Sequence, residues 1–140
     1  MSLLELSGFK KAIDTFERAF DAINQDQIVP TLSQDLQETL RAGLIQNFEF
    51  TYESAWKQIK RWLEKNYGNS IDGVTRRELF RLAAENHLIE EVDEWMLFHR
   101  ARNQTSHTYD QKVAAEVYHY ATLFLPTVKK LYQQLYDKND

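Results

Sequence analysis

Cysteine is absent from this 140-residue chain, and glycine and proline are scarce, with four and two residues. The lack of cysteine excludes disulfide bonds and cysteine-ligated zinc. The scarcity of glycine and proline favours a few long helices over many short strands. No stretch approaches the roughly 18 to 20 apolar residues of a membrane span, and the first residues lack the pattern of a secretory signal. We therefore expect one cytoplasmic domain, residues 1–140, with no membrane contact.

An excess of positive charge is also missing, because the formal net charge is −4. Proteins that coat nucleic acid without sequence preference are usually basic, so contact with RNA would need a local basic patch. Runs of this kind are more often solvated helix faces. The candidate residues lie on two segments, Lys57, Lys60, Arg61 and Lys65 on one, and Arg76, Arg77 and Arg81 on the next.

Apolar residues make up 43 % of the chain and recur at steps of three and four, the spacing of amphipathic helices. Ser33, Thr75 and Asp110 are suited to cap helix starts, and Gly68 to end a helix. The pattern predicts helices at about 3–24, 33–66, 75–86, 90–105 and 110–136, with a polar connector at 25–30. No strand pattern occurs. The expected fold is all-α: an antiparallel up-and-down four-helix bundle with one additional short helix.

Two groups of residues resemble metal ligands, but neither predicts a site. The acids at positions 90, 91, 93 and 94 are more simply explained by the positive N-terminus of a helix. Glu116 and His119 form a Glu-x-x-His pair, but di-iron bundles need two such pairs and two further glutamates. We therefore expect no metal and no cofactor.

One segment of eight residues brings together an arginine, a histidine and a tyrosine, side chains that can take part in catalysis or be modified. It is Arg102-Asn103-Gln104-Thr105-Ser106-His107-Thr108-Tyr109. Arginine stabilises phosphate charge, and histidine moves protons near neutral pH. Arg102 flanks the apolar stripe of its own helix, so it either covers the core with its methylenes or points into a shared interface. His107 lies about 140° further round an ideal helix. The two side chains meet only if the helix ends near Ser106 or if a second copy of the chain supplies the complementary residue.

Such a site suits RNA cleavage without metal. The 2′-hydroxyl is an internal nucleophile beside the scissile phosphate, and a histidine can accept its proton or protonate the leaving oxygen. Arg102 would stabilise the charge that builds on the phosphate. Asn103 is a candidate to orient the phosphate or the histidine, and His99 is a candidate to line the same cleft.

The string Arg-Asn-Gln-Thr-Ser-His-Thr-Tyr resembles the Arg-x4-His-x-Tyr motif of the HEPN superfamily. Residues 52–57, 75–77 with 88–89, and 95–102 resemble, in order, further segments of one family within it. This is the family of nucleotidyltransferase substrate-binding proteins, also called HepT toxins. The resemblance implies a dimeric helical bundle paired with a small nucleotidyltransferase encoded nearby. It also implies that Arg102 and His107 are the ribonuclease pair and that Tyr109 receives adenylyl groups that silence the toxin.

The sequence therefore leaves two alternative functions open. One is a metal-independent endoribonuclease toxin, and the other is a non-catalytic module that binds substrate for, or regulates, a separate nucleotidyltransferase. The chain has no glycine-rich phosphate loop and no Gly-Ser plus paired-aspartate pattern, so we do not expect it to be the transferase itself.

Overall fold

A computed structural model of the protein describes residues 3–24 and 29–139. Within these ranges the chain forms five α-helices and no strand, which confirms the predicted all-α fold. The expected connector at 25–30 lies largely outside the described residues, which resume at Val29 with a 3-10 turn. The helices are α1 (Ser7–Ile23), α2 (Gln34–Tyr67), α3 (Arg76–Glu85), α4 (Val92–Asn103) and α5 (Gln111–Asp137).

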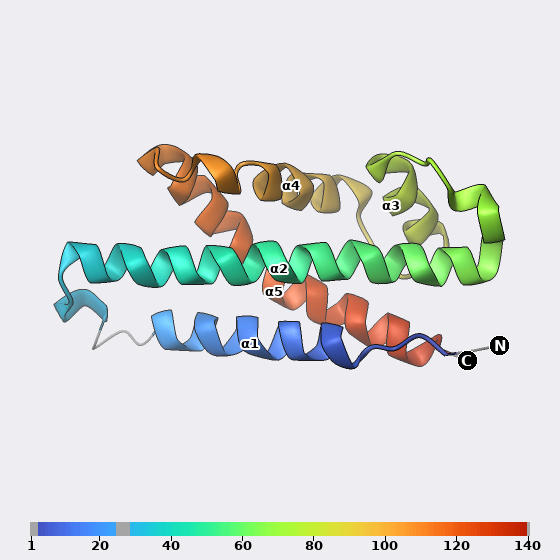
Figure 1. The fold of residues 1–140 in the computed structure, drawn as a ribbon, viewed down its shortest axis with the longest axis horizontal. Helices are drawn as coiled ribbons and strands as arrows, with labels where there is room; N and C mark the ends of the chain where they lie inside the picture. Colours follow the sequence, from blue (N-terminus) through green and yellow to red (C-terminus); the bar gives the residue numbers. More distant parts are fainter. Residues whose placement is uncertain (1–2, 25–28, 140) are drawn as a thin grey trace.

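The long helix α2 is the spine of the molecule (Figure 1). Helix α1 packs along one side of it, and α3 and α4 follow one another along the other side. Helix α5 starts beside the end of α4, crosses α2 and finishes against α1. The link between α4 and α5, which carries the motif, therefore lies at one end of the bundle.

The starts of α2, α3 and α5, and the end of α2, are set by residues that the sequence indicated, whereas α1 begins at Ser7, without a side-chain cap and later than predicted. The Ser33 hydroxyl accepts a hydrogen bond from the backbone N–H of residue 36 (3.2 Å), and Thr75 accepts one from residue 78 (3.1 Å). Asp110 accepts from residues 112 and 113 at the start of α5. Gly68 follows α2 with a positive φ of 65°, which is favourable for a residue without Cβ. The fourth helix starts at Val92, two residues later than predicted.

The core is built around one aromatic ring of α5. Phe124 is fully buried, and rings from α1, α2 and α4 surround it with centroids 4.9 to 6.3 Å away: Phe16, Phe48, Tyr52, Trp95 and Phe98. Edge-on and tilted contacts of this kind are the favourable geometries for aromatic pairs. Three helices are thus tied to α5 by a single side chain.

The apolar residues that recur at steps of three and four along α2, from Leu36 to Leu63, were expected to face inward, but the first two of them face solvent. Leu36 is 53 % exposed and Leu40 is 37 % exposed. The first turns of α2 extend past the end of α1 (Figure 1), so α1 does not run alongside them. From Leu44 onward the stripe is buried as predicted.

The two ends of the described chain are joined by hydrogen bonds. The backbone N–H of Leu4 donates to the Asn139 side-chain oxygen (2.8 Å), and the Asn139 amide nitrogen donates to the Leu4 carbonyl (3.1 Å). The indole N–H of Trp62 donates to the Lys138 carbonyl nearby. Both ends lie at the opposite end of the bundle from the α4–α5 link (Figure 1).

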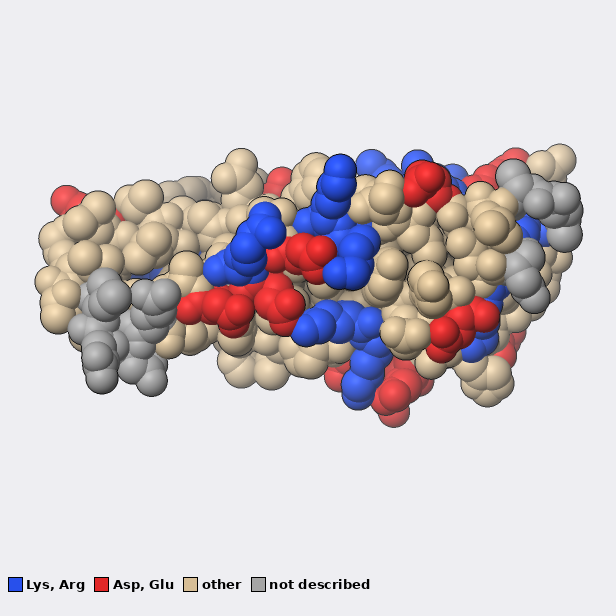
Figure 2. Space-filling model, turned by 90° about the horizontal axis from the view of Figure 1, so that it is seen from below, with Lys and Arg blue, Asp and Glu red and all other residues tan. Residues whose placement is uncertain are grey.

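Charges of both signs alternate on the face of the molecule nearest to α1 (Figure 2). Lys10 pairs with Asp14 of the same helix at 2.7 Å, and Lys129 of α5 pairs with Glu17. On α3, Arg77 and Arg81 are likewise paired, with Asp93 and Glu78. The arginines at 77 and 81 are therefore balanced by acids rather than forming a free basic surface. No helix among the described residues is long and apolar enough to cross a membrane.

Candidate active site

The motif spans the end of α4 and the short link to α5. Arg102 and Asn103 are the last residues of α4, and His107 ends a 3-10 turn that begins at Thr105. The backbone N–H of Gln104 contacts the carbonyls of residues 100 and 101, so the chain tightens from α to 3-10 geometry there. The helix thus ends three residues before Ser106.

Arg102 connects α4 to α2 through its guanidinium. Its Nε donates to the Glu53 carboxylate (3.0 Å), and a terminal nitrogen lies 3.7 Å from Glu49. The other terminal nitrogen donates to the Thr105 hydroxyl (3.4 Å), which itself donates to Glu49 (2.6 Å). The side chain is 28 % exposed. Within one chain, the guanidinium of Arg102 is therefore held by two carboxylates of α2.

Glu53 is also held from its other side. Its second carboxylate oxygen accepts the indole N–H of Trp56 (2.9 Å). The Arg76 guanidinium of α3 lies over the Trp56 ring, 3.4 Å from its centroid, a close cation–π contact. Burial lowers the pKa of Arg76, but arginine titrates so far above neutrality that it stays charged. Glu53 therefore lies in a cluster with two cations, Arg76 and Arg102.

His99 lies one turn before Arg102 and contacts both α2 and the motif. Its Nδ1 is 2.8 Å from the Tyr52 hydroxyl, and its Nε2 is 3.4 Å from the Asn103 amide nitrogen. Burial lowers the pKa of His99, and the nearby cations Arg76 and Arg102 lower it further. The imidazole is therefore neutral at pH 7.

His107 and Tyr109 project into solvent from the link. Their rings contact each other edge to face with centroids 6.2 Å apart, and Tyr109 is 84 % exposed. No hydrogen bond, ion pair or ring contact between described residues joins either of them to Arg102. The fold of one chain thus brings Arg102, Asn103 and His99 together and leaves His107 and Tyr109 apart from them.

Sequence reasoning did not select the acidic and aromatic partners of the motif. Glu49 and Glu53 are one helical turn apart on α2, and both face Arg102. Their i, i+4 spacing was the signal, but spacing alone does not say which helix faces them. Tyr52 and Trp56 lay within the segment 52–57 that carries the family resemblance, but no contact with the motif was expected of them.

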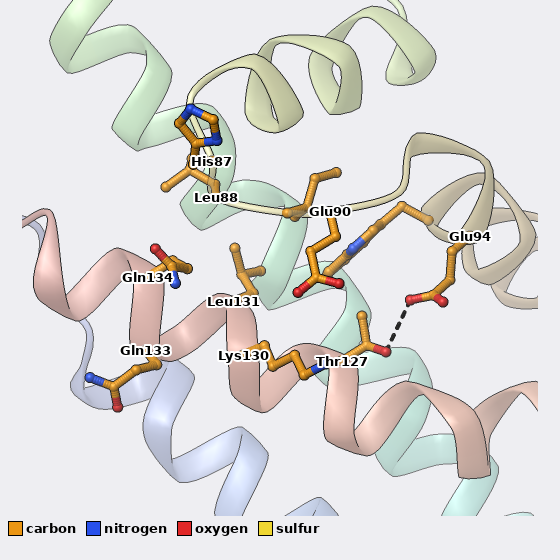
Figure 3. Close-up of a pocket in the computed structure, with 11 residues that line it drawn as sticks. His87, Leu88, Glu90, Glu94, Thr127, Lys130, Leu131, Gln133 and Gln134 are labelled. Carbon is orange, nitrogen blue, oxygen red and sulfur yellow. Dashed lines mark hydrogen bonds between the residues drawn. The ribbon is translucent and has the colours of Figure 1, made fainter.

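Two hollows lie on the described surface. A shallow groove of about 370 Å³ runs along α2 beside the two glutamates, lined by Gln46, Glu49, Phe50, Glu53, Ser54, Lys57 and Arg61. A pocket of about 270 Å³ lies between the α3–α4 turn and α5 (Figure 3), where Glu90 and Lys130 face each other across it and Thr127 donates to Glu94 (3.1 Å). No motif residue lines either hollow, but the groove is lined by Glu49 and Glu53, the carboxylates that pair with Arg102. Within the described ranges, no group of three or more histidine, aspartate or glutamate side chains is placed to hold a metal ion.

Comparison with known proteins identifies close relatives. The family described as "Nucleotidyltransferase substrate binding protein like" matches residues 4–137. A Haemophilus influenzae protein named "Probable ribonuclease HepT" is 39 % identical over 106 residues, which cover 74 % of this chain and 73 % of that protein.

Solved structures agree with this placement. A Haemophilus influenzae protein, described as having the fold of a substrate binding domain of a nucleotidyltransferase, superposes with a TM-score of 0.90 at 33 % identity. The match covers 94 % of this chain and 99 % of the other. A Thermus thermophilus protein shares the fold, with a TM-score of 0.70 at 22 % identity over 91 % and 98 % of the two chains.

Proposed function

Because the chain belongs to the family of nucleotidyltransferase substrate-binding-like proteins, we propose that it is a metal-independent endoribonuclease toxin. Its partner is a small nucleotidyltransferase encoded nearby, which silences it by adenylylating Tyr109. Arg102, Asn103 and His107 form the catalytic site. The observation that carries the proposal is the exposure of His107 and Tyr109 on a link directly after the anchored Arg102. The name of the Haemophilus influenzae relative points the same way.

The site is completed by a second copy of the chain. Arg102 and His107 do not meet within one chain, although both belong to one short motif. Phe50 is 66 % exposed and lines the groove next to Glu49 and Glu53, the partners of Arg102. A symmetric dimer that buries this face places the two motifs across its axis and pairs the arginine of one copy with the histidine of the other.

The chemistry follows from the groups that the motif supplies. The 2′-hydroxyl of RNA attacks the adjacent phosphorus, a 2′,3′-cyclic phosphate forms, and the 5′-oxygen of the next nucleotide leaves. The 2′-hydroxyl loses its proton and the leaving 5′-oxygen gains one, and His107 carries this proton transfer. Arg102 has five N–H bonds, and hydrogen bonds to Glu53 and Thr105 engage two of them. The other N–H bonds include both of those on the terminal nitrogen that lies 3.7 Å from Glu49, and we propose that they bind a phosphate oxygen while the carboxylates hold the guanidinium plane in place.

The test is RNA cleavage by the purified protein in the presence of a chelator and without its partner. The expected product ends in a 2′,3′-cyclic phosphate. We expect His107→Ala and Arg102→Ala each to lower the rate by about 10²-fold or more, the scale for a lost acid–base or charge-stabilising group. His119→Ala, which removes an exposed histidine of α5, is the matched control and should cleave like the parent. Equal rates for the parent and both motif variants would rule out this site.

One observation favours a second function. Two carboxylates lie against Arg102, so its charge is balanced before any RNA binds. This suits a non-catalytic subunit that binds substrate for the nucleotidyltransferase or regulates it, with Arg102 as a structural cross-link between α2 and α4. Absence of cleavage by the parent protein, together with tight binding to the nucleotidyltransferase, would support this function over the first.

A further inference from the structure

Tyr52, His99 and Asn103 form a line of polar contacts from the core to the motif. Tyr52 is fully buried in α2, His99 is half-buried in α4, and Asn103 is exposed at the last turn of α4. The two contacts, 2.8 Å and 3.4 Å long, use both nitrogens of the imidazole. Asn103 is the motif residue in this line. It has two candidate roles in the proposed reaction, which are to orient the phosphate or to orient His107.

The donors and acceptors along this line can be assigned one after another. An amide nitrogen only donates, so Asn103 Nδ2 donates to His99 Nε2, which then carries no proton. A neutral imidazole keeps its proton on the other nitrogen, so His99 Nδ1 donates to the Tyr52 oxygen. With its nitrogen bound to His99, the Asn103 amide turns its oxygen away from the imidazole, toward the exposed side.

We propose that His99 is a positioning residue that makes Asn103 a hydrogen-bond acceptor in the active site. An outward carbonyl oxygen does not bind a phosphate oxygen, since both are acceptors. In the proposed dimer it does accept the imidazole N–H of the second copy's His107, as a carbonyl or carboxylate does for the histidine of other catalytic sites. His99 thereby assigns the oxygen of Asn103 to orienting His107, while the second N–H of the amide, which His99 does not engage, remains a donor. This inference rests on the proposed ribonuclease function.

The orientation depends on the protonation of His99. The groups that act on it are Tyr52 and Glu53 of α2, Arg76 of α3 and Arg102 of α4. Burial and the two arginines lower its pKa, and Glu53 opposes them in part. The neutral form therefore persists at pH 7 and is lost as the pH falls through the lowered pKa. Protonated Nε2 carries a hydrogen, so the Asn103 amide must then turn its oxygen inward and lose its role as an outward acceptor.

Nuclear magnetic resonance tests the arrangement without any RNA. In the parent protein we expect the proton of neutral His99 on Nδ1. The side-chain amide signals of Asn103 should shift with the same midpoint pH as His99, and His99→Gln should abolish that titration. Asn66, whose amide donates to the Trp62 carbonyl within α2, is the control and should not shift with that midpoint. A proton on Nε2 of neutral His99, or Asn103 amide signals that do not titrate with His99, would overturn the proposal.

Cleavage kinetics test the consequence. We expect His99→Ala and Asn103→Ala each to lower kcat by about tenfold or more with little change in KM, the scale for losing an outer-shell partner of a functional group. The double variant should be no slower than the slower single variant, because both act through one contact. The proposal would be contradicted if the losses in kcat of the two single variants multiplied in the double variant, or if the variants changed KM alone. If the parent does not cleave RNA, the ribonuclease function fails, while the resonance experiment still decides whether His99 orients Asn103.

Discussion

His87 adopts a backbone conformation that residues with a Cβ rarely take, with φ at 61°. It follows the end of α3, where its N–H donates to the Ala84 carbonyl and the N–H of Leu88 donates to the Ala83 carbonyl. This pair of bonds is the Schellman motif, whose left-handed position usually holds glycine. The histidine therefore satisfies the helix end at a cost in backbone energy.

We expect His87→Gly to stabilise the protein by about 1 kcal/mol, because glycine takes a positive φ without the Cβ clash. The midpoint of urea unfolding measures the change. His87→Ala is the matched control, since it removes the imidazole but keeps the Cβ, and it should give no gain. An equal gain from alanine would show that the imidazole, and not the backbone, is the source of the cost.

Tyr109 is the most exposed of the large apolar and aromatic side chains of the described chain, at 84 %. Incubation with the partner nucleotidyltransferase, ATP and magnesium should add about 329 Da per adenylyl group, and intact-mass measurement detects it. The added phosphate would place negative charge on the link beside His107, where the RNA phosphate is proposed to bind.

Tyr109→Phe should abolish this addition. Tyr136, which is 63 % exposed on α5, provides the matched control, and Tyr136→Phe should be labelled like the parent. Labelling that persists in Tyr109→Phe would place the modification elsewhere, with Tyr118 and Tyr120 the next candidates.

At the scale of single side chains, sequence reasoning found the motif but not its supports. Arg102 and His107 were selected because their chemistry is visible in the residue type. Glu53 was not, because a glutamate on a long polar helix face looks like any solvated acid until the fold places it against Arg102. Contacts between α2 and α4 join residues 49 positions apart, and no local pattern records them.

At the scale of helices, the start of α5 lies directly beside the motif. The Asp110 carboxylate accepts the N–H groups of residues 112 and 113, which otherwise have no partner within the helix. We expect Asp110→Ala to destabilise the protein by about 1 kcal/mol, the usual cost of a lost N-cap. Asp110→Asn keeps an acceptor oxygen and should cost much less. Urea unfolding distinguishes the two, and equal losses would mean that the charge, and not the cap, is responsible.

Helix boundaries were predictable wherever a capping side chain was present. Ser33, Thr75 and Asp110 cap the helices that they were expected to cap. The start of the fourth helix was predicted two residues too early in the sequence. Glu90 and Glu91 were assigned to its first turn, but Glu91 is the residue that precedes the helix. The prediction that Leu36 is buried was wrong for a different reason. The periodicity of a helix shows which face is apolar, but not how far the neighbouring helices extend along it.

At the scale of the whole molecule, we expect a homodimer. Light scattering at micromolar concentration should give twice the 16.6 kDa mass of one chain. Phe50→Glu should shift the equilibrium to monomer, because it places a charge in the proposed apolar contact. Tyr136→Glu, on the exposed surface near the chain ends, should stay dimeric. A monomeric parent would contradict both the dimer and the composite site.

The hydrogen-bonded pairing of Leu4 with Asn139 has a practical consequence for labelling and immobilisation. Leu4 and Asn139 lie together at one end of the bundle, and the link with His107 and Tyr109 lies at the other end. A fluorescent protein or a surface tether joined to the chain outside residues 4–139 is therefore attached at the end opposite to the motif. Single-molecule experiments are thus free to hold the protein by one end and leave the motif open to RNA and to the modifying enzyme.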